Sequence, residues 1–267
     1  MSKQVRVLKN PGQAAAILSR FARPGVGRGT SYATVRDYCE SRDELPLITP
    51  LDGDLKNVQR PWAAKTIMAH VPPPARLLEI GGGEPIVSGF LAELGYDVTI
   101  VDPYDGFANG PTDYQRYLDL FPHVKIVREY LRPGLPGLAP HSFDAIFSIS
   151  VLEHVPPETL SSCFQAIAEF LTPTGASIHC FDFILQGNGD AYDRNHAGRI
   201  LAEQTALAGE ALPTPTFPEV LEKLCADVET FFLSPQGHHN WRGGRPYPEF
   251  PFRKVVSLQT VVFRARD

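Results

Sequence analysis

The chain has 267 residues, of which 43% are hydrophobic and 21% are charged, an ordinary balance for a globular protein with a proper core. Its formal net charge of −5 argues against a protein built to coat nucleic acid or an anionic membrane. No apolar run approaches the ~18 residues of a membrane helix, and the four cysteines are scattered without a metal or disulfide spacing. We therefore expect a soluble, cytoplasmic protein without a membrane segment.

The N-terminal 36 residues contain no Asp or Glu, although seven residues there are basic: Lys3, Arg6, Lys9, Arg20, Arg23, Arg28 and Arg36. We interpret this segment as a solvated helical region packed on the main domain. An organellar transit peptide and an arm for an acidic substrate or nucleic acid are the alternatives.

Helical patterns dominate the start of the chain. Residues 11–23 and 31–45 favour two helices separated by a glycine-rich turn through Gly29, and 62–71 favour a third that three prolines end. We assign residues 1–61 to an N-terminal helical extension and residues 62–267 to one domain.

From residue 75 onward, strands and helices alternate. Apolar strands are expected at 75–81, 97–102, 124–130, 143–150 and 175–183, with helices at 85–95, 112–121 and 156–171 between them. Apolar strands separated by amphipathic helices indicate a parallel sheet that is covered on both faces. A helix at 217–227 precedes two consecutive strands, at 228–234 and 254–265, which predict an antiparallel last strand. The fold class is thus α/β: a Rossmann-like, doubly wound, mostly parallel seven-stranded sheet with a helical cap.

The first strand runs into the stretch LLEIGGGEP, whose consecutive glycines Gly81, Gly82 and Gly83 allow a ligand to approach the backbone closely. A dinucleotide loop needs a third glycine where Ile86 stands, and Pro85 removes an amide donor that a phosphate would use. Glu79 and Glu84 add negative charge on either side. These features disfavour a pyrophosphate, hence a nicotinamide-dependent oxidoreductase, and favour a cationic ligand without phosphate at this point.

The second strand ends at Asp102, where a carboxylate can accept hydrogen bonds from both hydroxyls of a ribose. A ribose and a cation without pyrophosphate describe S-adenosylmethionine. The sequence predicts this molecule as the cofactor.

At this point the sequence resembles the class I S-adenosylmethionine-dependent methyltransferase family, over roughly residues 62–183. The resemblance rests on LLEIGGGEP, VTIVDPYD, FDAIFSISVLEHV and FLTPTGASIHCFDF, which occur in the order and at the spacing of that family. It implies that Glu79 and the three glycines line the methionine part of the cofactor and that Asp102 holds its ribose. Pro103 and Tyr104 would flank the adenine, Glu129 and Tyr130 would lie at its edge, and Ser148 and Ser150 would run under the methionine chain.

Methyl transfer is an in-line displacement that depends mainly on positioning, and it needs a base only for some acceptors. The candidate catalytic residues are His154, which follows the fourth strand, and His239, in the long segment 235–254 between the last two strands. Arg242 and Arg245 in that segment could hold an acidic acceptor or could simply be solvated. We expect this segment and a second insertion, 184–216, to face the acceptor.

Metal binding is not expected, because the spacing of His179, Asp182 and His196 matches no known ligand set. We expect methyl transfer to O or N of a small-molecule or glycan-type acceptor, with no nucleic-acid partner. The alternatives are an RNA or protein methyltransferase that uses the basic N-terminus, and a non-catalytic S-adenosylmethionine-binding protein. The sequence leaves the oligomeric state open, a homodimer included.

Overall fold

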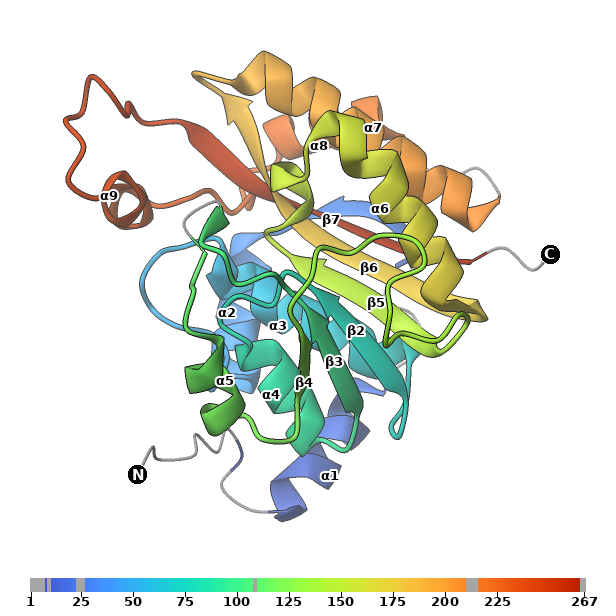
Figure 1. The fold of residues 1–267 in the computed structure, drawn as a ribbon. Coiled ribbons are helices and arrows are strands. Elements are labelled where there is room, and N and C mark those ends of the chain that lie inside the picture. The colour runs from blue at the N-terminus through green and yellow to red at the C-terminus, as the bar shows by residue number, and fades with distance from the viewer. Residues whose placement is uncertain (1–7, 9–10, 23–26, 108–109, 210–215, 265–267) are drawn as a thin grey trace.

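A seven-stranded sheet lies at the centre of the computed structural model, which describes residues 8, 11–22, 27–107, 110–209 and 216–264 (Figure 1). The strand order is β1-β7-β6-β5-β2-β3-β4. The bounds are β1 Gly29–Tyr32, β2 Arg76–Ile80, β3 Asp97–Val101, β4 Lys125–Val127, β5 Phe143–Ile149, β6 Leu171–Gln186 and β7 Lys254–Phe263.

Five neighbouring strands, β6, β5, β2, β3 and β4, run parallel. In the central strand β2, Glu79 lies opposite Ile100 of β3 and Phe147 of β5. β7 is antiparallel to β6 over a long register from Ala176 to Gln186. The mostly parallel sheet with an antiparallel last strand is confirmed, and its parallel strands all end at one edge.

Helices cover both faces of the sheet (Figure 1). One core cluster joins β2, β3 and β5 to α1, α3, α4 and α5, and a second joins the opposite face to α6, α7 and α8. This layering explains why the strands are apolar without alternation. The bounds are α1 Pro11–Phe21, α2 Val35–Glu44, α3 Lys56–His70, α4 Ile86–Glu93, α5 Tyr114–Leu120, α6 Pro157–Phe170, α7 Asp190–Ala208, α8 Phe217–Ala226 and α9 Pro235–Arg242, with a 3₁₀ turn, η2, at Leu152–His154.

The N-terminal region contributes a strand, where the sequence predicts a turn through Gly29 and a helix at 31–45. β1 pairs antiparallel with β7, and α2 begins only at Val35. Thr34 caps that helix: its hydroxyl accepts from the backbone of Asp37, and the Asp37 carboxylate accepts from the backbone of Thr34. The cap stops the helix from extending back into residues 29–32, which are free to add to the sheet edge.

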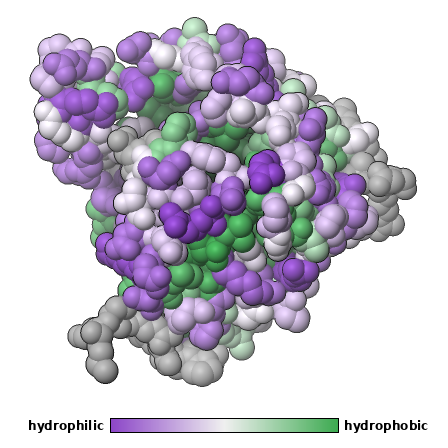
Figure 2. All heavy atoms as spheres, viewed as in Figure 1, coloured by the Kyte–Doolittle hydropathy of each residue, from purple (hydrophilic) through white to green (hydrophobic). Residues whose placement is uncertain are grey.

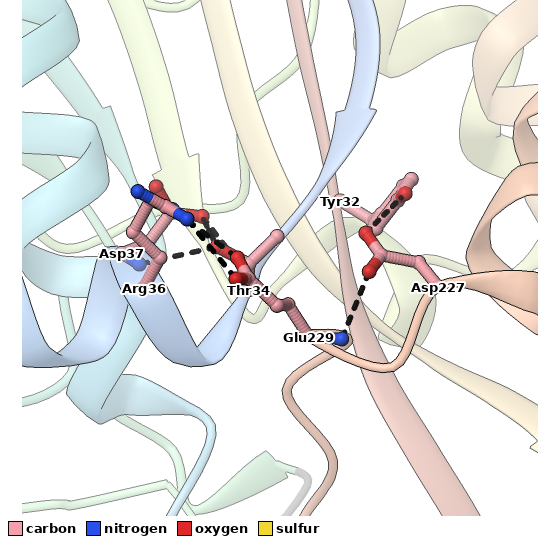
Figure 3. A network of polar contacts seen from close by, with 6 residues as sticks. All are labelled: Tyr32, Thr34, Arg36, Asp37, Asp227 and Glu229. Atoms are coloured by element: carbon pink, nitrogen blue, oxygen red, sulfur yellow. Dashed lines mark hydrogen bonds and ion pairs between the residues drawn. The ribbon is translucent and has the colours of Figure 1, made fainter.

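The expected strand at 228–234 is wrong. This segment makes only two isolated bridges, Thr34 with Thr230 and Phe232 with Val256. Figure 3 shows how side chains hold it to the N-terminal region: the Tyr32 hydroxyl donates to Asp227 over 2.8 Å, and Arg36 pairs with Glu229 over 3.1 Å. β1 therefore takes the outer position of the sheet beside β7.

The two predicted insertions contain helices, since α7 lies within 184–216 and α9 within 235–254. The boundary predicted between residues 61 and 62 falls inside α3, and the division of the chain at that point stays a prediction. Of the basic N-terminal residues, Lys3, Arg6, Lys9 and Arg23 lie outside the described residues. In the described part of the chain, no helix combines the length and apolar character that crossing a bilayer requires.

Candidate functional site

The three glycines after β2 have different steric surroundings. A Cβ at Gly81 would lie 2.7 Å from a Val151 methyl carbon, and one at Gly82 would lie 2.6 Å from Ile100. A Cβ at Gly83 would meet nothing closer than Pro111, at 3.8 Å. Gly81 and Gly83 also have left-handed φ angles of 64° and 48°. The first two glycines are therefore required by packing, whereas Gly83 leaves its side of the loop open to a ligand.

Asp102 lies directly after β3, beside the glycine loop. Its Oδ2 accepts a hydrogen bond from the Gly83 N–H, and its Oδ1 accepts one from the Tyr104 N–H, both over 2.8 Å. The Tyr104 hydroxyl in turn donates to the Gly83 carbonyl over 3.1 Å. These bonds orient the carboxylate, and each of its oxygens keeps a lone pair for a further donor.

The loops after β3 and β4 meet at the positions expected to surround an adenine. Tyr130, which is 55% exposed, donates its hydroxyl to Asp105 over 2.7 Å. Glu129 is exposed, and Pro103 is partly buried next to Asp102. Tyr104 is buried and has a φ of 51°, which is unusual for a residue other than glycine. These residues form one side of the candidate site.

Glu79 is buried within β2, and its carboxylate accepts a short hydrogen bond from the Ser88 hydroxyl. Burial raises the pKa of Glu79 to about 8, although the Ser88 hydrogen bond and the positive charge of Arg60 act to lower it. This shift favours the protonated form of Glu79. A cation placed beside it would favour the ionised form.

Ser148 and Ser150 at the end of β5 differ in what their side chains do. The Ser148 hydroxyl is fully buried and bonds Nδ1 of His179 over 2.8 Å, so only its backbone can serve a ligand. Ser150 has a left-handed φ of 56°, and its hydroxyl donates to Gln59 over 3.3 Å. Burial lowers the pKa of His179 to about 3, which keeps this imidazole neutral between Ser148 and Ser177.

Sequence reasoning missed a polar cluster at the ends of β5 and β6. Gln59 of α3 is fully buried and donates to Asp182 over 2.8 Å, and Glu153 accepts from the Asp182 backbone N–H over 3.0 Å. Burial raises the pKa of Asp182 to about 6 and that of Glu153 well above its ordinary value, with the Asp182 charge raising the latter further. The signals in the sequence are the acid within LEHV and Asp182, four residues before β6 ends.

Arg60 was also missed. Its guanidinium pairs with Glu84 over 3.2 Å, its side chain is 12% exposed, and its charge acts on the nearby Glu79. It thus brings a positive charge from α3 to the glycine loop. A single arginine in a helix carries no sequence signal of its own, because only the fold places α3 over this edge.

The two candidate catalytic histidines lie on different elements. His154 ends η2, and its side chain is exposed in part. Desolvation by the surrounding protein lowers its pKa, and the charges of Lys56 and His196 lower it further. His239 is exposed on α9, where its Nδ1 accepts from Arg242 over 3.2 Å. Its neighbour His238 is instead buried and stacks on Phe250, with ring centroids 5.6 Å apart.

A groove of about 620 Å³ lies away from the glycine loop, at the outer edge of the sheet. Its lining is mainly apolar and includes Phe232, Leu233 and Phe252, with Lys254 at one side. None of the predicted cofactor residues lines it. In the described part of the chain, no group of three or more His, Cys, Asp or Glu side chains is arranged to hold a metal ion.

Part of the chain, including the candidate site, is similar to known proteins. Residues 78–179 match the family model described as a methyltransferase domain. An uncharacterized protein of Mycobacterium tuberculosis is 31% identical over 123 residues, which are 45% of this chain and 39% of that protein. A protein-L-isoaspartate O-methyltransferase of Bordetella parapertussis is 28% identical over 129 residues, 47% of this chain and 46% of the relative. The matched segment thus spans less than half the length of these curated relatives.

Among solved structures, 1,6-didemethyltoxoflavin-N1-methyltransferase of Burkholderia thailandensis aligns with a TM-score of 0.42 at 18% identity, over 97% of this chain and 92% of that one. The region matched by the family model, residues 78–179, begins in β2 and ends in β6, so it contains both the glycine loop and Asp102. Residues 78–179 are therefore similar to a methyltransferase domain, which agrees with the family that the sequence motifs resemble.

Proposed function

We propose that the protein is an S-adenosylmethionine-dependent methyltransferase that methylates O or N of a small-molecule or glycan-type acceptor. The observation that carries the proposal is the joined pair of Gly83 and Asp102. The N–H of Gly83 donates a hydrogen bond to the Asp102 carboxylate, so an open glycine backbone lies beside an oriented carboxylate. Both lie at the carboxyl edge of a parallel sheet, where ligands bind in such folds.

The residues at this edge fit such a cofactor. Asp102 keeps acceptor capacity for the two ribose hydroxyls, and a Cβ at Gly83 would intrude on the open side of the loop. A cation beside the buried Glu79 would favour its ionised form, whereas a phosphate there would oppose ionisation, so this acid suits a cationic ligand. We assign Glu79, Gly81, Gly82 and Gly83 to the methionine part, Asp102 to the ribose, Pro103, Glu129 and Tyr130 to the adenine, and the backbone of Ser148 and Ser150 to the methionine chain.

When bound, S-adenosylmethionine supplies an electrophilic methyl group on a sulfonium. The chain contributes the positioning of the acceptor against that methyl, which is the main requirement of an in-line displacement. His239 or His154 would take a proton from an acceptor that must lose one. The hydrogen-bonded pair of the buried Gln59 and the partly buried Asp182 lies at the same edge of the sheet.

Calorimetric titration of the purified chain with S-adenosylhomocysteine, beside a titration with NADH, tests the proposal. We expect micromolar binding of the first and none of the second. Binding of NADH alone would mean that the glycine loop holds a dinucleotide. Binding of S-adenosylhomocysteine without turnover of any acceptor would favour the non-catalytic alternative, and salt-dependent binding of polynucleotide would favour the RNA alternative.

A further inference from the structure

Four basic side chains gather on α9 and the loop after it, residues 235–254, which we call the arginine lobe. They are Arg242, Arg245, Arg253 and Lys254, and Glu249 is the only acid in the lobe. The lobe projects from the body of the molecule at the upper left of Figure 1, and its surface is largely hydrophilic in the same view (Figure 2).

Two of these arginines lie against one aromatic ring. The guanidinium carbon of Arg245 is 3.9 Å from the centroid of the Phe250 ring, and that of Arg253 is 4.6 Å from it. Phe250 in turn stacks on the buried His238. The arrangement brings two positive charges together, and each charge disfavours the other.

In the described part of the chain, no carboxylate forms an ion pair with either arginine. Among the described residues, Arg253 is half-buried yet donates no hydrogen bond and forms no ion pair, and Arg245 donates only to the backbone carbonyls of Trp241 and Arg242. The charges of Asp193 and Asp182 act on Arg253 from a distance, and neither forms an ion pair with it. By contrast Arg20, Arg36 and Arg60 each pair with a glutamate.

The lobe contacts the body of the molecule just before α3 and at the end of β6. Trp241 donates its indole N–H to Asp54 over 2.7 Å, two residues before α3 begins. Arg253 packs beside Gly187 at the end of β6 and precedes Lys254, which lies opposite Gln186. The unpaired guanidinium therefore lies toward the same end of β6 as the partly buried Asp182.

We propose that Arg245 and Arg253 form a binding site for an oxyanion, a phosphate or a carboxylate, carried by the acceptor. A guanidinium presents N–H donors in a planar fork that matches both groups. An anion there would supply the missing hydrogen bonds of Arg253 and offset the repulsion between the two arginines. The anion site itself is inferred from the residues of the arginine lobe alone. The further step, that the anion is part of a methyl acceptor, rests on the proposed function.

The test measures the affinity of the full chain for inorganic phosphate and for succinate at constant ionic strength, by calorimetry and by the shift in melting temperature. Arg253→Gln removes the half-buried guanidinium, and Arg253→Lys keeps the charge without the fork. Arg199→Gln, on the exposed surface of α7, is the matched control. We expect Arg253→Gln to weaken anion binding by about tenfold or more, the loss expected for charged hydrogen bonds, with Arg253→Lys between it and the unaltered chain.

A response to phosphate alone identifies a phosphate site, and a response to succinate alone identifies a carboxylate site. The proposal is overturned if neither anion binds, or if both raise the melting temperature of Arg253→Gln and Arg199→Gln equally, as a general salt effect would. S-adenosylhomocysteine is titrated into every variant in parallel. Its failure to bind would remove the proposed function and leave the anion measurement standing, so the two failures are distinguishable.

Discussion

The backbone N–H of Gly83 donates a 2.8 Å hydrogen bond to Oδ2 of Asp102. This bond joins the loop after β2 to the residue that follows the neighbouring strand β3, 19 positions along the chain. It places an open stretch of backbone beside an oriented carboxylate, and the predictions for cofactor binding follow from that pairing.

Replacing Asp102 by Ala should weaken binding of S-adenosylhomocysteine by ~1.5–3 kcal/mol, because hydrogen bonds to a charged group are lost. Calorimetric titration measures the change. Asp119→Ala is the control, since Asp119 is exposed on α5 and bonds only the neighbouring Gln115. Unchanged affinity in Asp102→Ala would remove the ribose assignment.

Gly81→Ala and Gly83→Ala should fail in different ways. Both introduce a side chain at left-handed φ, which costs about 1–2 kcal/mol, but only Gly81→Ala also collides with Val151. We expect Gly81→Ala to lower the melting temperature more, and Gly83→Ala to remain folded while binding S-adenosylhomocysteine less tightly. If Gly83→Ala binds as tightly as the unaltered chain, no ligand approaches that backbone closely.

Glu79→Gln should change how stability depends on pH. The pKa of Glu79 rises from 4.5 to about 8 in the folded chain, so between these values the folded state holds a proton that the unfolded state has released. The free energy of unfolding should therefore fall as pH rises from 4.5 to 8, and Glu79→Gln should remove that part of the decline. Urea unfolding between pH 4 and pH 9 measures it, with the exposed Glu222→Gln as control. Parallel curves for the two variants would contradict the assignment of a buried proton to Glu79.

His239→Ala should leave the affinity for S-adenosylhomocysteine intact while slowing methyl transfer, by about 10²-fold or more if His239 is the general base. The residue is exposed on α9 and bonds only Arg242 among the described residues, so its loss should not affect folding. The readouts are calorimetry and single-turnover rates on an acceptor found by screening anionic amines and alcohols, with Gln236→Ala on the same helix as control. A fully active His239→Ala would leave His154 as the remaining candidate base.

The sequence by itself was sufficient for the parallel core of the sheet and for the glycine loop. Both depend on local patterns: apolar strands between amphipathic helices predict β2 to β6, and three consecutive glycines mark the backbone that a ligand can approach. Asp102 could be located because it directly follows an apolar strand, and parallel strands end at one edge.

Only the tertiary structure decided which distant residues meet. β1 pairs with β7 across more than two hundred positions, Gln59 reaches Asp182 across 123, and Arg245 and Arg253 share the ring of Phe250. These contacts leave no periodicity or spacing in the chain, because each partner is compatible with many surroundings. Burial and hydrogen-bond satisfaction in the folded state select one of those surroundings, so the missed strand, the polar cluster at Asp182 and the unpaired arginines became visible only in three dimensions.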